Sequence, residues 1–240
     1  MKYGRLAARR PVGLRDLTAY AGGPLPSAPP QVTPPSVADW GMYGNDQFGD
    51  CTAAGVVHLR MANAAEHAET ETFPTEQEVV AEYFALSGGQ DTGLVEADVL
   101  QTWQTTGLWG NKIVGYAPVD HRNQAELRSV VAAFGASYLG VAMPAPAQGQ
   151  FAAGQPWDLT STSADRQIEG GHCIVLAGYD DCFGYVVTWG ALQRATWRWL
   201  ATYLEEAWAV LSSEDDRVDD AALRADLAAL AQRSRPSATV

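Results

Sequence analysis

The stretch that decides the fold is GNDQFGDCTAA at residues 44–54. Its first half combines glycine, asparagine and aspartate, a composition typical of a tight loop. Its second half opens an alanine-rich segment whose apolar residues recur at helical spacing. We therefore expect a helix from Cys51 to about Ala68, with Asp50 as its N-cap. This helix places Cys51 in its first, buried turn.

Outward from this helix, the chain changes from helical to strand patterns. Capping patterns and periodicity predict three more helices, over residues 75–86, 96–105 and 123–134. Alternating and apolar runs predict strands over residues 138–143, 172–179 and 185–189, with turn residues at 180–184. Helices first and a hairpin-rich sheet second indicate an α+β fold.

Cys51 and His172 have the residue types and local settings that cysteine-based catalysis requires. The positive end of a helix dipole favours the thiolate of Cys51, whereas a carboxylate on Asp50 opposes it if it points inward. His172 follows two glycines at the start of an otherwise apolar strand, a solvent-facing position suited to a general base. The oxyanion donors that we expect are the Cys51 backbone N–H and the side-chain amide of Asn45 or Gln47.

Three segments resemble the papain-like cysteine peptidases. Residues 47–54 resemble the family's glutamine–glycine–cysteine helix entry, residues 171–180 its histidine strand, and residues 187–190 its asparagine–serine–tryptophan–glycine turn. The loop at residues 44–51 is also similar to a papain-like subgroup from actinobacteria and their phages. The resemblance covers residues 35–211 and implies a papain-like fold, with a helical half packed on a β-rich half.

The resemblance implies hydrolysis of an amide or peptide bond by a Cys51–His172 dyad, with Trp189 shielding the imidazole from water. The asparagine that orients the family's histidine has no counterpart here. Alignment on Trp189 puts Val187 in its place, whereas a count of sixteen residues from His172 gives Thr188, a weaker substitute with one hydroxyl. A second interpretation therefore stays open, in which the chain is a catalytically silent papain-like module used for binding or assembly, for example in a phage particle.

The chain divides into three predicted parts. Residues 1–34 form a proline-rich arm, residues 35–211 the papain-like domain, and residues 212–240 an acidic linker followed by an amphipathic helix with a leucine stripe. We expect the terminal arms to dock on the domain, on a second copy or on an assembly partner. An N-terminal arm across the cleft would inhibit the chain's own activity.

Composition restricts the partners further. A net charge of −12 argues against nucleic acid and anionic membrane surfaces. No apolar run approaches the ~18 residues that span a bilayer, and the N-terminus lacks the apolar stretch of a secretory signal, so we expect a cytoplasmic product, with virion association as the alternative. The three cysteines form neither a disulfide framework nor a metal-ligand pattern. We expect no cofactor and no metal, and a peptide or protein as the substrate.

Overall fold

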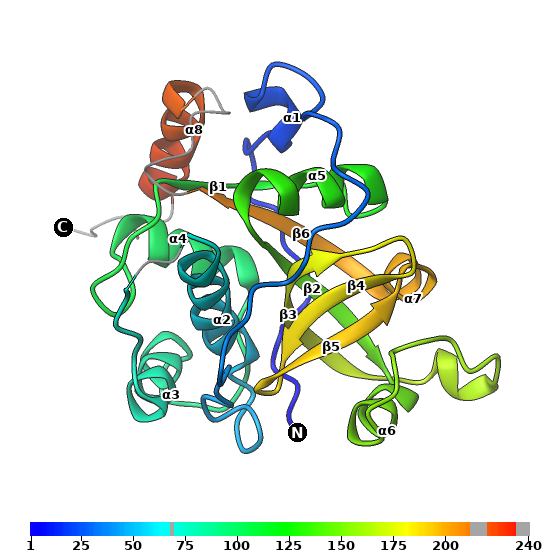
Figure 1. Cartoon of the computed structure of the whole chain (residues 1–240). Coiled ribbons are helices and arrows are strands. Elements are labelled where there is room, and N and C mark those ends of the chain that lie inside the picture. The colour runs from blue at the N-terminus through cyan, green and yellow to red at the C-terminus, as the bar shows by residue number, and fades with distance from the viewer. Residues whose placement is uncertain (68–69, 212–219, 234–240) are drawn as a thin grey trace.

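The computed structural model describes residues 1–67, 70–211 and 220–233. Its strands form an antiparallel sheet in the order β1-β6-β2-β3-β4-β5, and α2, α3 and α4 lie together beside it (Figure 1). The strands are β1 Gly115–Pro118, β2 Ser137–Pro144, β3 Ile168–Tyr179, β4 Phe183–Thr188, β5 Ala191–Thr196 and β6 Leu204–Leu211. The helices are α1 Leu17–Tyr20, α2 Cys51–Glu66, α3 Glu76–Leu86, α4 Glu96–Thr105, α5 Gln124–Phe134, α6 Pro146–Ala152, α7 Trp197–Tyr203 and α8 Asp220–Arg233, with a 3-10 turn at Ser163–Arg166.

The α+β class and the expected elements are confirmed. A capping box at Thr75 opens α3, and the Asn123 side chain accepts a hydrogen bond from the backbone N–H of Glu126 at the start of α5. The main difference is β3, which begins at Ile168, ahead of the expected start at His172. The glycines before His172 belong to the strand because their backbones pair with β2.

Helix α2 packs on β3, and this contact positions the site. The Tyr138 hydroxyl on β2 donates a hydrogen bond to the backbone carbonyl of Thr52 at 2.6 Å. Gly55 lets the helix approach the sheet, since an added Cβ would lie 2.7 Å from the Cys173 Sγ. The first turn of α2 is thereby held against the part of β3 that carries His172.

Asp50 occupies the N-cap position, but the prediction that its side chain caps α2 was wrong. The carboxylate makes no capping hydrogen bond, because the residue has φ −97° and ψ 16° instead of the extended backbone of an N-cap. One carboxylate oxygen faces the preceding loop, 2.7 Å from where a Cβ on Gly44 would lie. Burial raises the pKa of Asp50 to about 8.

Both terminal arms pack on the domain. Leu14, Leu17 and Tyr20 are buried in the core, and Leu223 of α8 joins them. The Tyr20 hydroxyl donates a hydrogen bond to an Asp226 carboxylate oxygen at 2.8 Å. The predicted C-terminal helix is present, whereas the predicted acidic linker over residues 212–219 and the side chains of Leu227 and Leu230 lie outside the described residues.

Within the described part of the chain, none of the helices has the length and apolar character needed to span a bilayer. The same residues contain no group of three or more His, Cys, Asp or Glu side chains placed to hold a metal ion.

Candidate active site

Cys51 is the first residue of α2 and lies at the boundary between the helical side and the sheet. Its Sγ accepts a hydrogen bond from the backbone N–H of Cys173 at 3.4 Å, so the sulfur touches the residue that follows His172. The side chain is 2% exposed. The two residues singled out for catalysis therefore reach the same place in the fold from α2 and β3.

His172 is fixed from one side and left unpaired on the other. Its Nε2 is 2.7 Å from the Thr188 Oγ1, a contact created by the antiparallel pairing of β3 and β4. Its Nδ1 is buried and has no hydrogen-bond partner among the described residues. Of the two positions that sequence counting left open, Thr188 makes this contact, while Val187 pairs with Val175 within the sheet.

Trp189 covers the imidazole of His172. The two rings stack with centroids 4.7 Å apart and an interplanar angle of 28°. Trp189 has φ 45°, a left-handed conformation that costs energy for a bulky residue. Edge contacts with Phe151 and Trp157 hold the indole in this position. The arrangement excludes water from one face of the imidazole.

The two candidate oxyanion donors lie in different settings. Asn45 is buried, and its Nδ2 donates hydrogen bonds to the carbonyl of Phe48 at 3.2 Å and to that of Lys2 at 3.5 Å. Gln47 is exposed on the loop. The Asn45 amide is thus engaged with the loop and with the N-terminal arm in this arrangement.

The first residues of the chain lie in a cleft between β3 and the loops that precede α2 and α4. The backbone N–H of Arg5 donates to the Gly171 carbonyl at 3.0 Å, and on the other side the Leu94 N–H donates to the Gly4 carbonyl at 2.8 Å. The Arg5 backbone pairs with Leu94 in a parallel bridge. In Figure 1 the N-terminal segment runs between the helical side and the strands. We call residues 2–6 the plug segment.

Glycines on both walls make room for the plug segment. A Cβ added to Gly93 or to Gly171 would overlap a carbonyl oxygen of this segment, and a Cβ added to Gly4 itself would overlap the backbone of Gly49. A Cβ on Gly170 would lie 2.8 Å from the Cβ of Tyr3. The cleft is therefore shaped for an extended backbone that approaches both walls closely.

The plug segment keeps both candidate catalytic groups uncharged. Burial raises the pKa of the Cys51 thiol to about 12, although hydrogen bonds from the backbone amides of Cys173 and Gly4 oppose this shift. Burial lowers the pKa of His172 to about 3, and the nearby charge of Arg5 lowers it further. At pH 7 the pair is consequently a thiol and a neutral imidazole. The ring of Tyr3 closes the site by lying edge-on to His172, with centroids 5.8 Å apart.

The orientation of the plug segment does not present a bond for attack. The backbone N–H of Gly4 is the group directed at the Cys51 sulfur, and the Gly4 carbonyl is turned to Leu94. A nucleophile needs the carbonyl carbon within reach and the carbonyl oxygen toward hydrogen-bond donors near the sulfur. The segment therefore occupies the cleft as a blocker.

Arg5 extends from the plug segment into an acidic pocket. Its guanidinium donates hydrogen bonds to Glu206 Oε1 at 2.9 Å, to Glu205 and to the Val141 carbonyl at 3.4 Å. Glu96, which is fully buried, lies close enough for its charge to affect Arg5. Burial, and repulsion from Glu206, raise the pKa of Glu96 well above its ordinary value.

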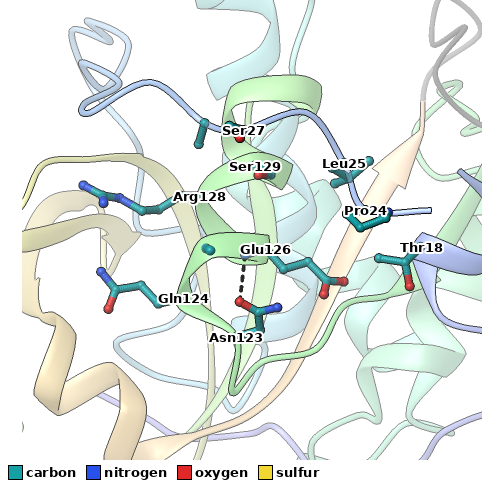
Figure 2. A pocket seen from close by; sticks show the side chains of 11 residues that line it. Thr18, Pro24, Leu25, Ser27, Asn123, Gln124, Glu126, Arg128 and Ser129 are labelled. Atoms are coloured by element: carbon teal, nitrogen blue, oxygen red, sulfur yellow. Dashed lines mark hydrogen bonds between the residues drawn. The ribbon is translucent and has the colours of Figure 1, made fainter.

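A separate pocket of about 690 Å³ lies between the N-terminal arm and the start of α5, away from Cys51 (Figure 2). Two of its polar side chains bond to the N-terminal arm: Ser129 donates to the Pro26 carbonyl at 2.9 Å, and Arg128 to that of Pro30 at 2.7 Å. This pocket consists of contacts that fasten the arm to α5.

Sequence analysis raised an N-terminal arm across the cleft as an alternative, but it identified neither residues 2–6 as the part that fills the cleft nor the acidic pocket. Residues 2–6 carry neither a strand period nor a motif. One pattern could have indicated the pocket, because Glu205 and Glu206 interrupt an otherwise apolar strand. A carboxylate in a buried strand needs a basic partner, and none is adjacent in the sequence.

No family model and no curated protein matches the sequence. Solved structures do match, among them xylellain, a cysteine protease from Xylella fastidiosa, at 15% identity and a TM-score of 0.67, over 88% of this chain and 96% of that chain. The proform of the ragweed pollen cysteine protease Amb a 11 matches at 15% identity and a TM-score of 0.55, over 90% of this chain and 66% of that chain. The cysteine protease and lectin-like domains of Cwp84, a surface layer associated protein of Clostridium difficile, match at 9% identity and a TM-score of 0.53, over 81% of this chain and 55% of that chain. The chain therefore has the papain-like cysteine protease fold.

Proposed function

We propose that the chain is a cysteine hydrolase that cleaves an amide or peptide bond in a peptide or protein substrate. One observation carries the proposal: Thr188 holds the Nε2 of His172 at 2.7 Å while the buried Nδ1 has no partner among the described residues, and the Cys51 sulfur accepts a hydrogen bond from the backbone N–H of the next residue, Cys173. A ring held in this way can take a proton from a neighbouring thiol.

In the proposed reaction the Cys51 thiol gives its proton to the Nδ1 of His172, and the sulfur attacks the substrate's carbonyl carbon. The negative oxygen of the tetrahedral intermediate is held by the Cys51 backbone N–H and by the Asn45 or Gln47 amide. The C–N bond then breaks, and His172 returns the proton to the leaving amine. Water, deprotonated by His172, attacks the thioester and releases the acid and the thiol.

Thr188 is a positioning residue in this scheme. When His172 is protonated, its Nε2–H donates to the Thr188 oxygen, so the hydroxyl fixes the ring plane. Because the hydroxyl is uncharged, it adds little electrostatic stabilisation to the imidazolium. We therefore propose a slower hydrolase than one with a better hydrogen-bonding group at this position.

The arrangement described above is the blocked form in this proposal. The Gly4 N–H of the plug segment is directed at the thiol, and the Arg5 charge disfavours the imidazolium. Departure of the segment would admit water to both groups and remove the Arg5 charge, and we expect both pKa shifts to decrease.

The proposal can be tested by cutting the chain behind the plug segment. A recognition sequence for a site-specific protease is inserted between Ala7 and Ala8, which are both exposed. The cut leaves the plug segment held by noncovalent contacts alone, and it keeps Leu14 and Leu17 in the core. We expect the cut chain to hydrolyse fluorescein-labelled casein, and the uncut chain to leave it intact.

The matched controls are cut chains that carry Cys51→Ala or His172→Ala, for which we expect no hydrolysis above background. Hydrolysis that survives either substitution would refute the proposed mechanism. Intact casein with a freely alkylated Cys51 would favour the second candidate, a silent module whose open cleft binds a partner. The observation behind that candidate is that a threonine hydroxyl, that of Thr188, contacts His172 where the family resemblance implies an asparagine.

A further inference from the structure

We propose that the pocket filled by Arg5, with Glu206 at its wall, is the specificity pocket of the cleft and selects an arginine side chain in the substrate. This inference rests on the proposed function, because it names the residue that a substrate of the same site would carry. The plug segment that fills the pocket with Arg5 also directs the N–H of the adjacent Gly4 at the Cys51 sulfur, so a substrate at Cys51 must replace this segment.

The shape of the pocket fits a long, unbranched side chain. Gly140 lines it, and a Cβ at that position would lie 2.7 Å from the Cδ of Arg5 and 2.6 Å from the Cγ of Glu206. On the opposite side, Gly171 allows the Arg5 backbone to approach β3. The aliphatic stem is enclosed, and 2% of the Arg5 side chain remains exposed.

The polar groups of the pocket match a guanidinium. Glu206 uses one carboxylate oxygen for Arg5 at 2.9 Å and the other for the indole Nε1 of Trp208 at 3.2 Å, so the acceptor is held in place. Glu205 accepts from a second terminal nitrogen of Arg5 at the pocket mouth, and the Val141 carbonyl lies 3.4 Å from that nitrogen. Acceptors on two terminal nitrogens suit the planar fork of arginine better than the single point charge of lysine.

The pocket remains when the plug segment leaves, because its walls belong to β2, β3 and β6 of the sheet. An open cavity of about 290 Å³ continues from Arg5 past Glu169 and Glu205. Without Arg5, the buried Glu206 loses its cationic partner, and carboxylates in such sites favour a replacement cation. A substrate arginine restores the pair.

The test uses two alkylating probes in the full-length Arg5→Ala chain. One is the bromoacetamide of agmatine, which carries a guanidinium, and the other is its urea analogue, which has the same shape without charge. Alkylation of Cys51 by each is followed by mass spectrometry. We expect the guanidinium probe to react faster at Cys51 by about tenfold or more, the size of one hydrogen bond to a charged group. The exposed Cys182 reports any intrinsic difference between the probes.

The matched variant is Arg5→Ala with Glu206→Gln, in which the preference at Cys51 should fall to the ratio seen at Cys182. Equal rates at Cys51 in the Arg5→Ala chain, or a preference that Glu206→Gln leaves unchanged, would overturn the proposal. If Arg5→Ala fails to fold by circular dichroism, Arg5→Gln takes its place.

A second measurement separates this proposal from the proposed function. The melting temperature of the Arg5→Ala chain is measured in the presence of agmatine and in the presence of its urea analogue. This comparison does not require the chain to hydrolyse anything. Stabilisation by agmatine that is lost with Glu206→Gln supports the pocket even if casein stays intact. Hydrolysis by the cut chain without any preference for the guanidinium would refute the pocket and leave the proposed function standing.

Discussion

Replacing Arg5 by alanine should expose Cys51. The guanidinium forms a buried ion pair with Glu206. The Arg5 side chain is 2% exposed and the Glu206 side chain is 8% exposed. Breaking such a pair by removing one partner costs about 3–5 kcal/mol. The cavity beside Arg5 is open, so water can enter the vacated pocket and solvate Glu206, and we reduce this cost to about 2–3 kcal/mol.

This loss acts on the docking of the plug segment. If alkylation of Cys51 requires the segment to leave, its rate follows the population of open molecules. A loss of about 2–3 kcal/mol multiplies that population about 30- to 140-fold. Cys51 alkylation by iodoacetamide at pH 7.5 should accelerate by the same factor, as measured by mass spectrometry against Cys182 in the same molecule.

Arg9→Ala is the matched control for Arg5→Ala. Arg9 also forms an ion pair, with Asp98, but the two side chains are 64% and 47% exposed. Exposed pairs contribute about 0–1 kcal/mol, so the rate should change at most about fivefold. Similar acceleration by both substitutions, or a wild-type Cys51 that already reacts as fast as Cys182, would refute the argument that Arg5 locks the cleft.

Three further predictions concern the site itself. In the cut chain, Thr188→Val should lower casein hydrolysis by at least about tenfold, since His172 loses its positioning contact, whereas Thr188→Asn should retain or raise it. Equal hydrolysis rates for the cut chain and both Thr188 variants would show that the contact is irrelevant. In the uncut chain, the Cys51 thiol should stay protonated above pH 9, because burial raises its pKa to about 12, and an ultraviolet thiolate absorbance that appears near pH 8.5 and is missing from Cys51→Ala would contradict the buried state. The pKa of Asp50 is raised to about 8, so the stability that this group contributes is fully present below about pH 4 and is lost as the pH rises through 8. In urea unfolding, the free energy of unfolding of Asp50→Asn should not fall in this way. Free energies of the two chains that change with pH in parallel would contradict the prediction.

The helices could be predicted because their determinants are local. Capping residues and apolar periodicity indicated α3 and α5 with nearly their observed bounds. Thr188 was one of two candidates to contact His172, reached by a count of sixteen residues beside the family resemblance, and its Oγ1 lies 2.7 Å from the Nε2 of His172. The prediction that Asp50 caps α2 failed because capping depends on φ and ψ, which composition does not determine.

The plug segment could not be predicted from the sequence. Its five residues are held by backbone hydrogen bonds to Leu94 and Gly171 and by one side chain, Arg5, in a pocket built from distant strands. Such docking depends on the tertiary shape of the cleft, and the sequence of the segment contains no period that reports it. The adjacent residues Glu205 and Glu206, of which Glu206 is buried, were the nearest indication, and they required the knowledge that β6 lies beside the cleft.

The central claim is that Cys51 and His172 form a reactive pair once the plug segment is released. The most direct measurement is the pH dependence of Cys51 alkylation in the cut chain, with and without His172→Ala. A thiolate–imidazolium pair predicts rapid alkylation that persists below about pH 6 and is lost in the variant. A profile that rises near pH 8.5, as for a free thiol, and is the same in both chains would contradict the claim.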